Sequence, residues 1–206
     1  MDNKKIEDVF NETFSGLTLF YRDTTLSENL ISKYQVGQII MERGFTDMTF
    51  MGGGLKSNFR YLIASAFGKD LSAFNPDASK VGHIVLTSNA YFKVLDIYYV
   101  DNKTQVFLLN IPENAVDLFH NATTNIETDI IQKARESFDS KKDLEPIKEL
   151  QNYDWQERTK FPIGMNDNGI LFFDNSQIKQ INIDQSTTKN EIEGNIQEMK
   201  PWWEFW

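Results

Sequence analysis

The chain has 206 residues, of which 40% are hydrophobic and 13% aromatic, and 30 acidic against 21 basic residues give it a formal net charge of −9. This length supports one domain with appendages and enough apolar residues for a core. The acidic surplus disfavours binding to nucleic acid or to an anionic membrane, and the lack of cysteine excludes disulfides, cysteine nucleophiles and cysteine-based zinc sites.

The first twenty residues predict a helix, because apolar residues from Ile6 to Phe20 recur at helical spacing and leave the charges on the other side. The same residues contain no uninterrupted apolar run, so they do not resemble a signal peptide, and a cytoplasmic location is expected. A second helix is predicted to begin at a capping box formed by Thr25 and Glu28 and to end at Gly44.

The middle of the chain predicts strands. Residues 59–67, 82–100 and 104–112 are rich in aromatic and β-branched side chains. The last two runs predict a hairpin that turns on Asp101 and Asn102, both of which tolerate unusual backbone angles.

Helical spacing returns after Pro112 and again from Thr124 to Phe138, and a further stretch is expected over residues 144–155. A turn at Asn168-Gly169 precedes a predicted late strand. The fold class is therefore α+β, with a mainly antiparallel sheet of about four or five strands flanked by N-terminal and later helices.

Residues 1–174 are predicted to form this single domain, and residues 175–206 a polar tether with an aromatic tip, "PWWEFW". Either the tip folds back onto an apolar groove of its own chain or it binds a partner, since tryptophan is enriched at binding hot spots. The candidate partner-binding residues are Trp202, Trp203, Glu204, Phe205 and Trp206.

The stretch "FMGGGLKSNFR" raises the question of a phosphate-binding loop. A Walker-type loop fails, because Leu55 separates the last glycine from Lys56 and no glycine stands at the required distance before it. The glycines are therefore interpreted first as a flexible connection. The alternative is a mobile ligand loop, whose candidate residues are Gly52, Gly53, Gly54, Lys56 and Arg60.

Two histidines limit acid–base chemistry. His83 lies in a predicted strand, and His120 follows Asp117 by three residues on a predicted helix, where the two would share a face. A histidine near a helix C-terminus is also favourable without any function. No motif of a known family is present, no metal or cofactor is expected, and no catalytic residue is assigned.

The favoured function is a non-catalytic, acidic protein-binding module that neutralises a basic partner, as an immunity-like protein would, or escorts it as an adaptor. Two alternatives stay open. One is a small hydrolase or ligand-binding enzyme that uses His120 with Asp117, or His83, under a glycine lid. The other is a structural oligomer held together by its tryptophan-rich end.

Overall fold

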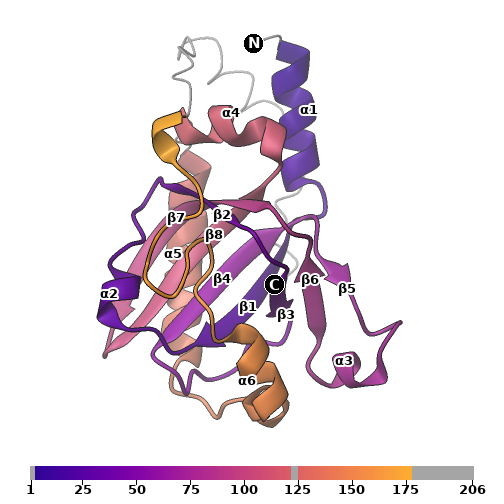
Figure 1. Cartoon of the computed structure of the whole chain (residues 1–206), viewed down its shortest axis with the longest axis vertical. Coiled ribbons are helices and arrows are strands. Elements are labelled where there is room, and N and C mark those ends of the chain that lie inside the picture. The colour runs from indigo at the N-terminus through magenta and orange to yellow at the C-terminus, as the bar shows by residue number, and fades with distance from the viewer. Residues whose placement is uncertain (1–2, 122–124, 178–206) are drawn as a thin grey trace.

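The computed structural model of the chain describes residues 3–121 and 125–177 (Figure 1). Its strands are β1 (Thr18–Thr24), β2 (Ile39–Glu42), β3 (Thr46–Thr49), β4 (Phe59–Ser65), β5 (Lys69–Asp70), β6 (His83–Leu86), β7 (Ala90–Val100) and β8 (Lys103–Ile111). Its α-helices are α1 (Asn3–Phe14), α2 (Glu28–Ile31), α3 (Pro76–Lys80), α4 (Val116–Asn121), α5 (Asn125–Lys141) and α6 (Tyr153–Thr159). Short 3-10 turns are η1 (Glu113–Ala115), η2 (Lys148–Gln151) and η3 (Asn175–Gln177).

The eight strands form one sheet in the order β2-β7-β8-β4-β1-β3-β6-β5. Every neighbouring pair is antiparallel except β4 with β8, which is parallel. This arrangement confirms the predicted α+β class, with a mainly antiparallel sheet and with helices both before and after the sheet in the sequence. The sheet has more strands than expected.

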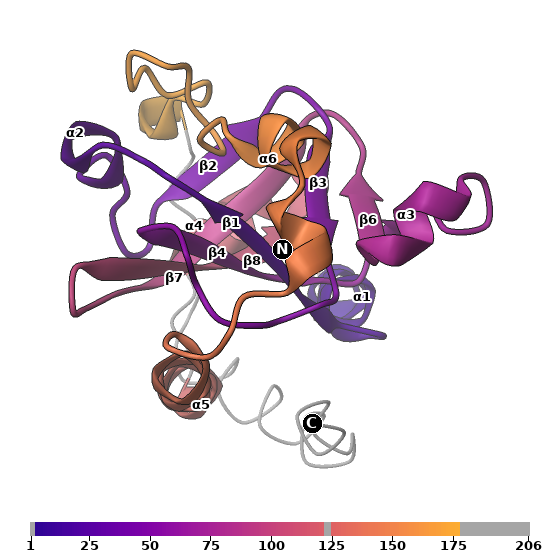
Figure 2. The same cartoon turned by 90° about the horizontal axis from the view of Figure 1, so that it is seen from below.

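The sheet buries an apolar layer on each face, because side chains along a strand point alternately to opposite sides. On β1, Phe20 belongs to the core shared with α2 and with residues 163–165, whereas Tyr21 belongs to the core shared with α1, α4 and α5. Figure 2 shows α5 and α6 on opposite sides of the sheet. This alternation decides which residues of β1 reach each face.

The predicted hairpin is present, and it joins β7 to β8. Asp101 and Asn102 form the turn with φ angles of +49° and +61°. Left-handed backbone angles of this kind are tolerated by Asp and Asn better than by most residues.

The region after β1 differs from the prediction of a helix from Thr25 to Gly44. Only α2 is helical there; its N-cap residue is Ser27, whose side chain makes no capping hydrogen bond. The helix ends at Ile31, and Gly37 adopts a φ of +84° in the turn that leads into β2. Ile39 and Ile40 are then buried in β2, which pairs with β7. Strand pairing and burial thus outweigh the helical spacing of the sequence.

The last part of the described chain contains less regular structure than predicted. The late strand is absent from the described residues and is reduced to a single bridge between Met165 and Leu171, with Gly169 at positive φ in the turn. Asn175 donates to and accepts from the backbone of Ile39. The aromatic tip of residues 201–206 lies outside the described residues, so its role stays a prediction. No helix within residues 3–121 and 125–177 is long and apolar enough to cross a membrane.

Candidate active site

A buried arginine on the central strand β1 is the least expected polar feature of the fold. The Arg22 side chain is 4% exposed and shares its face of the sheet with Phe20 and Tyr61, inside an otherwise apolar core. Burial lowers the pKa of the Arg22 guanidinium from its ordinary value. A buried cation without a matched anion is costly, so its hydrogen-bond partners matter.

The guanidinium of Arg22 is held by main-chain oxygens. Its Nη1 donates to the carbonyl of Asp47 at 3.3 Å, and its Nη2 donates to the carbonyl of Phe161 at 2.8 Å. Its Nε is buried and has no hydrogen-bond partner among the residues that the structure describes. In the described part of the chain no carboxylate lies within ion-pair distance of Arg22. The carboxylates of Asp47 and Glu42 act on this charge only from beyond ion-pair distance.

A carboxylate–imidazole pair lies beside this arginine. His83 Nε2 and Asp47 Oδ1 are 2.6 Å apart, and both side chains are largely buried. The pairing of β3 with β6 brings them together, since Thr49 faces His83 across the ladder and Asp47 lies two residues before Thr49. A carboxylate that accepts from one ring nitrogen fixes the tautomer and leaves the other nitrogen as a base.

Helix α6 supplies the third side of the site. Asn152 caps it by accepting from the backbone N–H of Trp155 at 2.8 Å. The Trp155 ring meets the His83 ring edge-on, with centroids 5.3 Å apart. Arg158, one turn further along, comes within 4.0 Å of Asp47 but is mostly exposed. The helix thus orients the imidazole and adds a second cation at the rim.

Residues 160–163, which follow α6, cover Arg22. Besides the Phe161 carbonyl, the Lys160 carbonyl accepts from the Thr24 hydroxyl at 3.1 Å, and the Ile163 N–H donates to the Tyr61 hydroxyl at 3.0 Å. Burial raises the pKa of Tyr61 to about 12, so the phenol stays neutral at ordinary pH. A few main-chain hydrogen bonds hold this cover in place.

The other predicted histidine pair does not join the site. Asp117 and His120 both lie on α4, which Figure 1 places at the opposite end of the molecule from α6. Of the two histidines, only His83 lies in the cluster with Arg22 and Asp47. Sequence inspection missed Arg22 and Asp47, and the available signal was the charged pair Arg22-Asp23 inside an aromatic, strand-forming run.

The glycine loop connects β3 to β4 and is packed tightly. The carbonyl of Gly53 accepts from Arg60 Nη2 at 2.9 Å, and a Cβ added at Gly54 would lie 1.7 Å from the carbonyl oxygen of Leu144. Lys56 is exposed, whereas the Arg60 side chain is buried and paired with Asp23. The structure therefore separates the two cations that the ligand-loop hypothesis placed together.

No metal centre is evident in the part of the chain that the structure describes. Across residues 3–121 and 125–177, no group of three or more His, Asp or Glu side chains is placed to hold a metal ion. The chemistry available at the Arg22 site is that of an anion-binding guanidinium next to an acid–base pair.

Comparisons with known proteins give similar structures but no family. No family model and no curated protein matches the sequence. The type III effector XopAI from Xanthomonas axonopodis pv. citri is similar over 49% of this chain and 46% of its own, with 16% identity and a TM-score of 0.42. The ADP-ribosyltransferase HopU1 of Pseudomonas syringae pv. Tomato DC3000 is similar over 46% and 45%, with 18% identity and a TM-score of 0.41.

Exoenzyme S from Pseudomonas aeruginosa, in complex with human 14-3-3 protein beta and bound to Carba-NAD, is similar over 62% of each chain, with 12% identity and a TM-score of 0.42. The chain thus spans less than two thirds of the length of these proteins. At TM-scores near 0.4 the similarity does not define the function of this chain.

These comparisons nevertheless correct the favoured function. The predicted non-catalytic, immunity-like or adaptor module is wrong, because the similar structures are ADP-ribosyltransferases, an exoenzyme and an effector. The physical reason for the error is that motif spacing was used to exclude a reactive centre. Arg22, Asp47 and His83 come from three separate strands, and only the folded sheet brings them together.

Proposed function

We propose that the chain is an enzyme that acts on an anionic, phosphate-bearing small molecule at the Arg22 site. The observation that carries this proposal is the buried guanidinium of Arg22, which has no carboxylate partner in the described part of the chain and a buried Nε without a hydrogen bond. Arginine presents several donors in a rigid fork that fits phosphate oxygens. A bound phosphate would satisfy the charge and the free donor together.

The His83–Asp47 pair supplies the acid–base step. When Nε2 of His83 carries the proton that Asp47 accepts, Nδ1 is the base that takes a proton from a hydroxyl or water nucleophile. The edge-on contact with Trp155 keeps the ring in this orientation. Asp47 stabilises the imidazolium that forms, in the manner of a carboxylate–histidine pair.

Access to Arg22 requires that residues 160–163 move. An incoming phosphate oxygen replaces the carbonyl of Phe161 as the acceptor for Nη2 of Arg22. The guanidinium thereby exchanges a neutral acceptor for a charged one. Residues 160–163 and Tyr61 would then lie against the bound ligand, where they exclude water.

The test is ligand binding and turnover by the full chain. NAD is a suitable first probe, because exoenzyme S is bound to Carba-NAD, with ATP and inorganic pyrophosphate as further anions and adenosine as the uncharged match. We expect NAD or ATP to bind by calorimetry and adenosine to bind at least ten-fold more weakly. For whichever ligand is a substrate, Asp47→Asn is expected to lower kcat about a hundred-fold with little change in KM. Arg22→Lys is expected to raise KM.

Arg43→Lys is the matched control, since Arg43 is exposed and lies outside the site. Circular dichroism of each variant separates loss of function from loss of folding. The proposal fails if none of the phosphate-bearing probes binds, or if Arg22→Lys and Arg43→Lys bind the same probe equally well.

We also propose that the protein partner of this enzyme is basic, because the net charge of −9 would attract a basic surface and speed encounter. A second copy of the chain is the alternative partner. Binding to a partner purified from the native host that weakens as salt is added supports the first proposal, whereas a dimeric mass in solution supports the second.

A further inference from the structure

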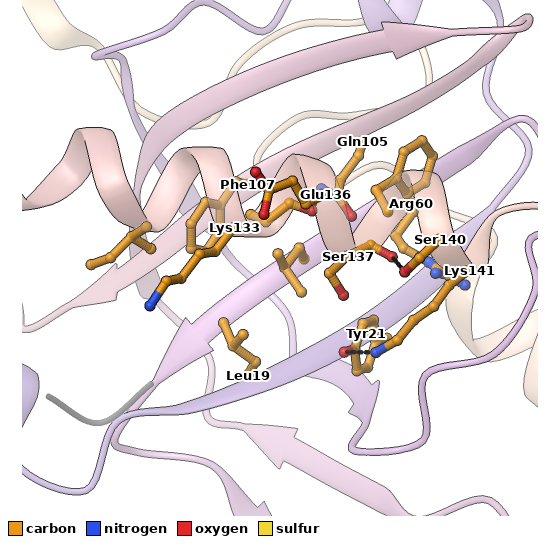
Figure 3. A pocket seen from close by; sticks show the side chains of 14 residues that line it. Leu19, Tyr21, Arg60, Gln105, Phe107, Lys133, Glu136, Ser137, Ser140 and Lys141 are labelled. Carbon is orange, nitrogen blue, oxygen red and sulfur yellow. Dashed lines mark hydrogen bonds between the residues drawn. The ribbon is translucent and has the colours of Figure 1, made fainter. Parts of the chain in front are cut away.

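A pocket lies on the face of the sheet opposite Arg22, between α5 and strands β1, β4 and β8 (Figure 3). Its volume is about 520 Å³, within the range of small-molecule sites. Leu19, Leu62, Phe107 and Ile130 form most of its apolar wall. The Arg22 site lies on the opposite face, so this pocket is not part of the candidate active site.

One end of the pocket is cationic. Lys141 Nζ lies 3.4 Å from the Tyr21 hydroxyl and 5.6 Å from the centre of its ring, and it forms no ion pair with any carboxylate in the described part of the chain. Arg60 lies over the same ring at 5.4 Å. Figure 3 shows Arg60, Lys141 and Tyr21 together at one end, with Leu19, Phe107 and Lys133 towards the other.

The charge available at this end is about that of a single cation. Asp23 accepts from Nε and Nη2 of Arg60 at 2.7 Å each and neutralises most of its charge. The Nη1 of Arg60 makes no hydrogen bond with a described residue. Glu136, the acidic residue of the lining, is exposed and accepts from Gln132. Lys141 therefore supplies the net positive charge, and Arg60 supplies a further donor.

We propose that this pocket binds a small amphipathic monoanion, a carboxylate with an alkyl tail. The carboxylate lies at Lys141 and Arg60 Nη1, where a charge-assisted hydrogen bond is stronger than a neutral one. The tail lies along the apolar wall under α5. The end at Lys141 has about one net positive charge and adjoins an apolar wall, which fits a fatty-acid-like ligand better than a phosphate-rich one; Lys133 also lines the pocket but is exposed and lies toward the other end (Figure 3).

The fixed shape of the cationic end supports the proposal. The glycine loop holds Arg60 through the Gly53 carbonyl, and Gly52 lies so close to Tyr21 that an added Cβ would be 2.5 Å from its ring. Arg60 and Tyr21 are thus kept in position without a ligand, which reduces the ordering cost of binding. The glycine loop therefore positions residues of the pocket, although its own glycines do not line it.

The test is titration of the full chain with octanoate and decanoate below their micelle concentrations, followed by calorimetry. Each added CH₂ that is buried is expected to tighten binding about four-fold, so decanoate should bind at least ten-fold more tightly than octanoate. Lys141→Met is expected to weaken decanoate binding about ten-fold. Lys148→Met removes the same charge from an exposed position outside the pocket and is expected to leave the affinity unchanged.

Ser137→Phe provides a second variant, since Ser137 lines the pocket from α5 and a phenyl ring there would fill it. We expect it to abolish decanoate binding while circular dichroism stays that of the folded chain. Decyltrimethylammonium, a cation of the same tail length, should not bind. Equal decanoate affinity of the parent chain, Lys141→Met and Ser137→Phe would overturn the proposal, and so would equal affinity for the cationic amphiphile.

Discussion

Asp23→Asn is expected to lower the free energy of unfolding by about 3 kcal/mol, because it leaves a buried guanidinium without its carboxylate. The Arg60 side chain is 1% exposed, and its two hydrogen bonds to Asp23 form a bidentate pair. Although burial by itself lowers the pKa of Arg60, the pair with Asp23 raises it above its ordinary value. Urea denaturation of the variant and the parent chain measures the loss.

Asp77→Asn is the matched control, since Asp77 pairs with Lys80 on a fully exposed surface, where an ion pair contributes little. It is expected to unfold at the parent's urea midpoint. The double variant Asp23→Leu with Arg60→Met should recover much of the stability lost in Asp23→Leu alone, because it removes the stranded charge. An Asp23→Asn midpoint equal to that of Asp77→Asn would show that the buried pair is not formed in solution.

Gly54→Ala is the second substitution with a large expected effect. The added methyl carbon would lie 1.7 Å from the carbonyl oxygen of Leu144. This oxygen belongs to the backbone and the position of the Cβ is fixed by the backbone, so no side-chain rotation relieves the contact. The chain must shift the glycine loop or the segment after α5, and we expect a cost of about 3 kcal/mol. The loss is read from the urea midpoint and from the melting temperature.

Gly44→Ala serves as its control, because the nearest atom to the added carbon is a flexible Glu42 oxygen at an ordinary contact distance of 3.5 Å. Its stability should stay within about 0.5 kcal/mol of the parent chain. If Gly54→Ala is as stable as Gly44→Ala, then the loop is not packed against residue 144 and the interpretation of a mobile ligand loop regains support.

The sequence predicted those parts of the fold that depend on local patterns. The hairpin at Asp101-Asn102 and the strand beginning near Phe59 follow from turn chemistry and from runs of β-forming residues. The helix predicted over residues 25–44 is wrong. The helical spacing of its apolar residues is real, but the pairing of β2 with β7 buries Ile39 and Ile40 more completely than a surface helix would.

The candidate site could not be predicted in the same way. His83 was considered, but its partner Asp47 is one of thirty acidic residues, and nothing in the sequence distinguishes it. An arginine in a strand is ordinary in a sequence. Arg22 is unusual because it is buried and has no carboxylate within ion-pair distance among the described residues, and only the structure shows this. Such sites depend on strand order and register, which sequence spacing does not encode.

Neighbouring residues of strand β1 belong to different sites. Tyr21 and Asp23 lie on the face of the pocket under α5, and Arg22 between them lies on the face of the candidate active site. Inserting or deleting one residue at the start of this strand would move each of these side chains to the opposite face of the sheet. The Arg22 guanidinium would then lie in the pocket under α5, and the Tyr21 phenol would lie on the face of the candidate active site. Evolution can therefore alter either site by substitution, but a change in strand length would exchange the contents of both at once.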